Sequence, residues 1–194
     1  MPAEQRVSTG AESSGMENYP AAFSFLHSTV TAFRVATRKT NMSDRIKTIN
    51  AAMRGNPDWQ KVLEIILAEY DCQTGTLHQW NDLRAMLELI AHRGIPRELM
   101  DKVERIPMGK GIAGAAAERM EPVQLCNLQT DNSGVARPKA KKTKVGGSIA
   151  VPIDMGGLLM GTLGIGKLEP YDFTAAETAE LQQIAGNIAE KWMG

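Results

Sequence analysis

The chain has 194 residues, the length of one ordinary domain with some excess or of two very small ones. Its 43% of hydrophobic residues is enough for one sizeable core, and its 22 basic and 22 acidic residues cancel, so no global basic field exists to attract nucleic acid. No run approaches the roughly 18 to 20 apolar residues of a membrane span, and the N-terminus lacks the pattern of a secretory signal. Its two cysteines have no metal-ligand spacing, so we expect a cytoplasmic protein with free thiols.

The first 41 residues differ in composition from the rest, and we expect an N-terminal extension, with 42–194 as the folded domain. Residues 1–19 have little to bury, which predicts disorder. Three interpretations of residues 20–42 remain open. The segment 21–36 fits a short amphipathic helix on the domain or a weak targeting or membrane-surface segment, and Met42 fits a functional start.

Two helices are predicted next. Ile46, Ile49 and Met53 recur at helical spacing and end at the run beginning with Gly55. A second helix comes after this run, with Asn56 as the expected N-cap, proline at its first position, and an end near residues 70–71.

The middle of the chain mixes strands and short helices. Alternating residues predict a β-hairpin over 74–80 and 86–92. A short helix is expected over 95–105, an alanine-rich helix over 111–119 and a strand over 122–125.

A long polar loop over 131–146 comes next, then two strands around the turn 154–157. Thr174 and Glu177 have the spacing of a capping box that opens the last helix, whose buried stripe includes Leu181 and Ile188.

This order of elements favours an α+β fold with a central antiparallel sheet of about five or six strands. We expect the N- and C-terminal helices on one face of the sheet. The short helices and the long loop are then expected over a pocket on the other face.

Seven landmarks in order resemble those of a GAF domain. They are the helix from Asp58, the two hairpin strands, the run from Ile106 to Gly114, Glu121-Pro122-Val123, the run from Ser148 to Ile153, and Phe173-Thr174. The resemblance covers about residues 43–192 and implies a small ligand-sensing, dimerising module with a pocket roofed by the long loop. Because this family is functionally broad, the resemblance names no ligand.

The run from Gly109 to Gly114 also matches Gly-x-Gly-x-x-Gly before a helix, a dinucleotide-binding signature. Pro107 precedes it and cannot donate to a strand ladder, so we interpret the glycines as a turn with close helix packing. The free N–H groups of the helix start, with Lys110 nearby, remain able to bind an anion.

The basic residues of the long loop include Arg137 and Lys144. Without interleaved aromatic residues they do not indicate nucleic acid, and a solvated loop is the simpler interpretation. The alternative is that one of them reaches inward to a small anion, for which the planar guanidinium of arginine is suited.

Cys126 ends a strand beside the expected pocket, whereas Cys72 lies between a helix and a strand. Free methionine sulfoxide reductases of the same fold use several clustered cysteines, and a thiol enzyme needs a nucleophile and a resolving thiol. We therefore expect no enzyme activity. His78 and His92 are interpreted as surface or half-buried residues rather than haem ligands, and neither a bilin attachment nor a cyclic-nucleotide pattern is present, so the cofactor is unknown.

The sequence thus predicts a regulatory GAF-type sensor that binds a small polar or anionic ligand and signals as a homodimer or through a partner protein. The alternatives are a dimerisation module without ligand, disrupted by Leu181→Asp or Ile188→Asp, and a thiol redox enzyme that needs Cys126. The expected ligand-binding residues are Cys126, Asn127, Asp131, Arg137, Lys144 and Ser148.

Overall fold

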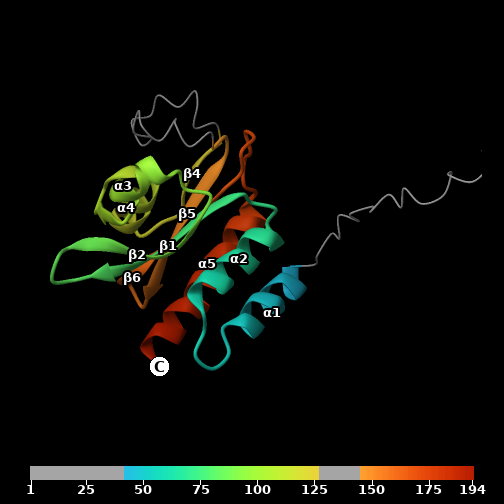
Figure 1. Cartoon of the computed structure of the whole chain (residues 1–194). Coiled ribbons are helices and arrows are strands. Elements are labelled where there is room, and N and C mark those ends of the chain that lie inside the picture. Colours follow the sequence, from blue (N-terminus) through green and yellow to red (C-terminus); the bar gives the residue numbers. More distant parts are fainter. Residues whose placement is uncertain (1–41, 127–144) are drawn as a thin grey trace, which may run out of the picture. The chain divides into compact units, whose positions relative to one another are not determined.

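A computed structural model describes residues 42–126 and 145–194 (Figure 1). The expectations for the N-terminal extension and for most of the long loop therefore lie outside the described residues. Among the described residues, no helix is both long and apolar enough to cross a membrane.

Six strands of the described chain form one antiparallel sheet in the order β3-β2-β1-β6-β5-β4. The strands are β1 (Thr74–Asn81), β2 (Met86–Arg93), β3 (Arg105–Pro107), β4 (Val123–Leu125), β5 (Ser148–Met155) and β6 (Leu158–Gly166). The chain therefore has the predicted fold class. Because no described pair of strands is parallel, the glycine-rich run is not part of a dinucleotide-binding βαβ unit.

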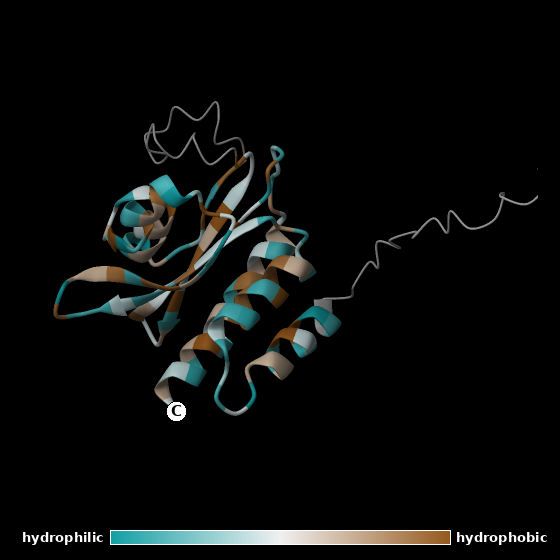
Figure 2. Cartoon of the chain, in the orientation of Figure 1, coloured by the Kyte–Doolittle hydropathy of each residue, from teal (hydrophilic) through white to brown (hydrophobic). Residues whose placement is uncertain are grey.

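Three helices lie on one side of the sheet in Figure 1: α1 (Met42–Ala52), α2 (Trp59–Glu69) and α5 (Ala175–Met193). α2 packs on β1 and β2, α5 packs on β5, and α1 packs on α2 and α5. Each of these helices carries both hydrophobic and hydrophilic residues (Figure 2), as amphipathic helices do. The predicted placement of the terminal helices on one face is confirmed.

The main core lies between these helices and the sheet. Leu181 and Ile188 of α5 are 1% and 0% exposed there, so they hold the domain together. They are the wrong probes of a dimer contact, because an aspartate at either position would disrupt the core itself.

The other side of the sheet carries a 3-10 turn (η1, Arg97–Leu99), α3 (Met100–Val103) and α4 (Gly111–Arg119). α4 covers β4, β5 and β6, and its buried alanines pack on Val123 and Ala150. The short side chains of α4 allow the close approach that the glycine- and alanine-rich sequence predicts.

Two predicted boundaries are wrong. Asp58, not Asn56, caps α2, because its carboxylate accepts hydrogen bonds from the backbone N–H of Gln60 (3.1 Å) and Lys61 (3.4 Å). The helix predicted over 95–105 stops at Val103, and Arg105–Pro107 pairs with β2 as an edge strand, a setting in which a proline is tolerated.

The turn and cap chemistry of the C-terminal half is confirmed. Gly156 and Gly157 adopt positive φ values of 58° and 86° in the β5–β6 turn. Thr174 and Glu177 form the reciprocal hydrogen bonds of a capping box at the start of α5.

Candidate ligand-binding face

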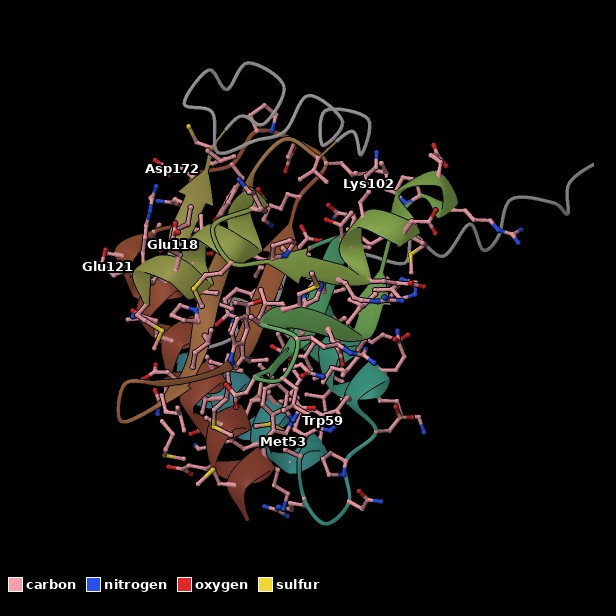
Figure 3. All side chains as sticks on the ribbon, turned by 90° about the vertical axis from the view of Figure 1, so that its left-hand side faces the viewer. Met53, Trp59, Lys102, Glu118, Glu121 and Asp172 are labelled. Carbon is pink, nitrogen blue, oxygen red and sulfur yellow. The ribbon has the colours of Figure 1, made fainter. Side chains whose placement is uncertain are left out.

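The candidate site lies on the sheet face that carries α3 and α4. Figure 3 views the molecule from this side, with Lys102 of α3 and Glu118 of α4 in its upper half and Trp59 and Met53 at its lower end. Residues directly opposite on neighbouring antiparallel strands point to the same face. The strand register therefore identifies the side chains that form the floor.

Three rows of paired residues cross the centre of this face. The first joins Thr74, Gly166 and Ser148, the second joins His92, Thr76, Gly164 and Ala150, and the third joins His78, Thr162 and Pro152. The alternate residues of the same strands, such as Leu77, Leu163 and Val151, point into the main core on the opposite side. We call Thr74, Thr76, His78, His92, Ser148, Thr162, Gly164 and Gly166 the polar floor.

The middle of the polar floor is only partly covered. Thr76 and Gly164 are half-buried although they lie on the two central strands of the sheet. On either side of them, Ala150 is covered by α4, and the His78 imidazole contacts α3. Thr76 and Gly164 are therefore positions on this floor that the described helices do not bury completely.

Four buried polar atoms on this floor have no hydrogen-bond partner among residues 42–126 and 145–194. They are His78 Nδ1, His92 Nδ1, Ser148 Oγ and Thr162 Oγ1. In the same part of the chain only one further buried side-chain atom, Nε of Arg45 on α1, lacks a partner. Because buried polar groups are normally paired, this concentration on one sheet face needs an explanation.

His78 is the most constrained of these residues. Its ring is fully buried, and Nε2 lies 2.8 Å from the carbonyl oxygen of Val103, to which it must donate. Burial lowers the pKa of His78 to about 4, against a small opposing effect of that hydrogen bond, so the ring is neutral at pH 7. Nδ1 therefore carries a lone pair, and this buried atom has no hydrogen-bond partner among the described residues.

The structure describes two of the six residues that the sequence predicts for ligand binding, Cys126 and Ser148. Ser148 lies on the polar floor at the start of β5, where its hydroxyl is buried. Cys126 directly follows β4, as predicted, and is exposed. Asn127, Asp131, Arg137 and Lys144 lie outside the described residues, so their predicted roles remain predictions.

Sequence reasoning missed His78 and Thr162. Thr74, Thr76 and His78 alternate with apolar residues in β1, and such alternation is typical of a strand with one solvated face. The interpretation of His78 as a surface or half-buried residue is wrong, because α3 covers it.

The residues on both sides of 127–144 are hydrogen-bonded to one short segment, 167–173. The Cys126 carbonyl accepts a hydrogen bond from Tyr171 N–H (3.1 Å), and Gly147 N–H donates to the Glu169 carbonyl (2.8 Å). The Tyr171 hydroxyl donates to the Glu177 carboxylate (3.0 Å) in the first turn of α5. Segment 167–173 therefore connects the rim of the candidate face to the start of α5.

Among the described residues, the polar floor contains no lysine or arginine. Lys167 is buried, but its ammonium donates to the Asp71 carbonyl (3.1 Å) and lies 4.6 Å from the centre of the Tyr171 ring. Among the described residues, no group of three histidine, cysteine or acidic side chains could hold a metal ion.

The two thiols are not arranged as a reactive pair on this floor. Cys72 belongs to the main core on the opposite side of the sheet, and burial raises its pKa to about 12. Such a thiol is a poor nucleophile, since the thiolate is the reactive form.

A separate open pocket of about 340 Å³ lies at the outer edge of β2 and β3, lined by Arg84, Glu88, Leu89, Met100, Glu104 and Arg105. Arg84 and Glu88 already form a 2.7 Å ion pair, and the lining holds as many acidic as basic residues. Its charge therefore favours no class of ligand, and the polar floor is the stronger candidate.

Comparison with known proteins establishes the family. The sequence model of the GAF domain family matches residues 59–190, more than half of the chain. The chain belongs to the GAF domain family, a ligand-binding regulatory fold. No curated protein matches it in sequence.

Solved structures share the fold. The GAF domain of a phosphoenolpyruvate-protein phosphotransferase from Coxiella burnetii superposes with a TM-score of 0.67 at 24% identity, covering 79% of this chain and 93% of that chain. A free methionine-R-sulfoxide reductase of Neisseria meningitidis, solved with its substrate, gives 0.65 at 15% identity, covering 78% and 88%. The A. aeolicus nlh2 GAF domain in an inactive state gives 0.60 at 16%, covering 78% and 95%. At these identities the likeness shows the fold alone.

Proposed function

We propose that this protein is a cytoplasmic GAF-type sensor that binds a small polar molecule on the polar floor and has no enzyme activity of its own. The observation that carries the proposal is the set of four unpaired buried polar atoms on one half-open sheet face. A ligand that pairs with these atoms would recover the hydrogen bonds that the free protein lacks.

Binding is proposed to reach a partner or a second copy of the chain through α5. Segment 167–173 touches both the rim of the candidate face and the first turn of α5, which supports this route. A tenfold change in partner affinity needs only about 1.4 kcal/mol of coupling free energy. The outward residues of α5, such as Gln182 and Gln183, are exposed and are better probes of such a contact than the core residues Leu181 and Ile188.

The alternative of a thiol redox enzyme draws on the structural likeness to the free methionine-R-sulfoxide reductase. The described cysteines favour binding over this chemistry, because Cys72 is buried on the far side of the sheet from the polar floor. Turnover of free methionine sulfoxide that disappears in Cys126→Ser would establish the enzyme instead.

Native mass spectrometry of the purified full chain, compared with its mass after denaturation, tests the proposal. We expect a non-covalent small molecule that is retained under native conditions and reduced in Thr162→Val. The proposal would be contradicted if the protein carries no ligand and no metabolite pool raises its unfolding temperature. That result would favour the alternative of an interaction module without ligand.

A further inference from the structure

The neutral His78 ring gives the polar floor a chemical preference, which rests on the proposed function. Nε2–H is committed to the Val103 carbonyl, so the free nitrogen, Nδ1, has a lone pair and no proton. An ionised carboxylate has only lone pairs to offer, and two lone pairs repel. A group with an N–H or O–H satisfies Nδ1.

Thr162 lies directly opposite His78 on the neighbouring strand, and its hydroxyl is fully buried and unpaired among the described residues. A hydroxyl both donates and accepts, so it complements a group that has a donor and an acceptor side by side. A primary carboxamide, or the amide-like edge of a nucleobase, has this arrangement.

The charges of the described residues around the polar floor also favour an uncharged ligand group. Lys167, which is buried, contacts Asp71 and Tyr171 instead of the floor. Among the described residues, no row of the polar floor contains an acidic or basic residue apart from the two histidines. An ionised group placed beside His78 and Thr162 would lose its hydration without gaining a counter-ion from the described residues.

We infer that the part of the ligand that contacts His78 and Thr162 is an uncharged hydrogen-bond donor–acceptor group of the carboxamide type, donating to His78 Nδ1 and pairing with the Thr162 hydroxyl. These two residues determine specificity on the floor, whatever holds the rest of the molecule. The floor then discriminates an amide from the corresponding acid, because the acid leaves Nδ1 unpaired.

The test uses acetamide and acetate, two small planar probes of nearly equal size that differ in the donor and the charge. In the full chain labelled with ¹⁵N, the imidazole nitrogens of the three histidines are recorded with each probe, and His78→Gln assigns the His78 signals. The backbone amides of Thr76, Ser148 and Gly164 report independently whether a probe enters the floor.

We expect acetamide to shift His78 Nδ1 to the position of a hydrogen-bonded acceptor, and acetate to leave it unchanged. Thr162→Val should weaken acetamide binding about tenfold, whereas Thr48→Val, which alters a threonine hydroxyl bonded to the Asp44 carbonyl in α1 and away from the polar floor, should leave it unchanged.

A Nδ1 signal that is already hydrogen-bonded in the free protein shows that this atom has a partner without ligand, such as a water or the Thr162 hydroxyl, and overturns the inference. Acetate that perturbs the floor amides and His78 more than acetamide also overturns it, while the proposed function stands with an anionic ligand. If neither probe moves the floor amides, both the inference and the proposed site are contradicted.

Discussion

Tyr70 and Glu180 lie 110 residues apart in the sequence, and the Tyr70 hydroxyl donates a 2.9 Å hydrogen bond to the Glu180 carboxylate inside the domain. Arg45 of α1 completes the cluster, with its guanidinium 3.3 Å from the same carboxylate and 5.1 Å from the centre of the Tyr70 ring. The buried charge of Glu180 is thus paired by residues from the end of α2 and from α1, and the three helices on this side are joined at one point.

Tyr70→Phe should lower the free energy of unfolding by about 2 kcal/mol, because it removes a buried hydrogen bond to a charged group. Tyr171→Phe is the matched control, since its hydroxyl also donates to a glutamate, Glu177, but is less buried. We expect a loss of about 0.5 to 1 kcal/mol for the control. Urea denaturation of both variants measures the difference, and equal losses would show that the buried cluster has no special role.

Thr162→Val should leave the free protein as stable as before or raise its free energy of unfolding by about 1 kcal/mol, because the valine has the same shape and removes an unpaired buried hydroxyl. Thr74→Val removes a hydroxyl that donates to the Gly166 carbonyl at 3.2 Å and should cost about 1 kcal/mol. Thermal unfolding of both proteins without ligand gives the comparison. A destabilised Thr162→Val would mean that the Thr162 hydroxyl is paired in the free protein.

Gly147→Ala should destabilise the domain by about 1 to 3 kcal/mol, because a Cβ at this position would collide with the backbone of Tyr171. Gly186→Ala should instead stabilise it by about 0.5 to 1 kcal/mol, since this glycine lies inside α5 with open space where the Cβ would be. Denaturant midpoints of the two variants should move in opposite directions. A harmless Gly147→Ala would show that segment 167–173 is not held tightly against the start of β5.

Acid should destabilise the protein through His78. Its pKa is about 4 in the folded state and 6.5 in the unfolded chain, so the unfolded state binds a proton first as the pH falls. The free energy of unfolding should therefore drop by about 3 kcal/mol between pH 7.5 and pH 4 from this residue alone. Denaturation of wild type and His78→Gln across this range isolates the contribution, because the carboxylates titrate in both. Parallel pH profiles would show that folding does not lower the pKa of His78.

The two thiols should react at very different rates. Cys126 is exposed, whereas Cys72 is 8% exposed and burial raises its pKa to about 12. Iodoacetamide at pH 8 should modify Cys126 and spare Cys72 until the protein unfolds. Intact-mass measurement with peptide mapping follows both sites, and equal labelling of the folded protein would show that the helix-side core opens near Cys72.

Much of the fold could be predicted because its signals are local. The capping box of Thr174 and Glu177, the Asp154–Gly157 turn and the helical spacing of Ile46 and Ile49 each act within a few residues. The short strand β3 could not be predicted, because Arg105–Pro107 has no alternation to detect and depends on pairing with β2.

The candidate site was less predictable for a physical reason. His78 and Thr162 come together only because β1 and β6, far apart in the sequence, are neighbours in the sheet. A single strand shows that a residue faces one side, but which side another element covers depends on the whole topology. The position of Ser148 could be predicted because a landmark of the family lies at the start of β5, and its role in ligand binding stays a prediction.

The most direct test of the central claim is to map where small molecules bind on the full chain. Amide spectra are recorded while pools of metabolites are added, with Thr162→Val as the control. If the ligand binds on the polar floor, a binding pool should perturb Thr76, Thr162, Gly164 and Ser148 first, and Thr162→Val should weaken the effect. Perturbations confined to α1, α2 and α5, with the polar floor unchanged, would contradict the claim.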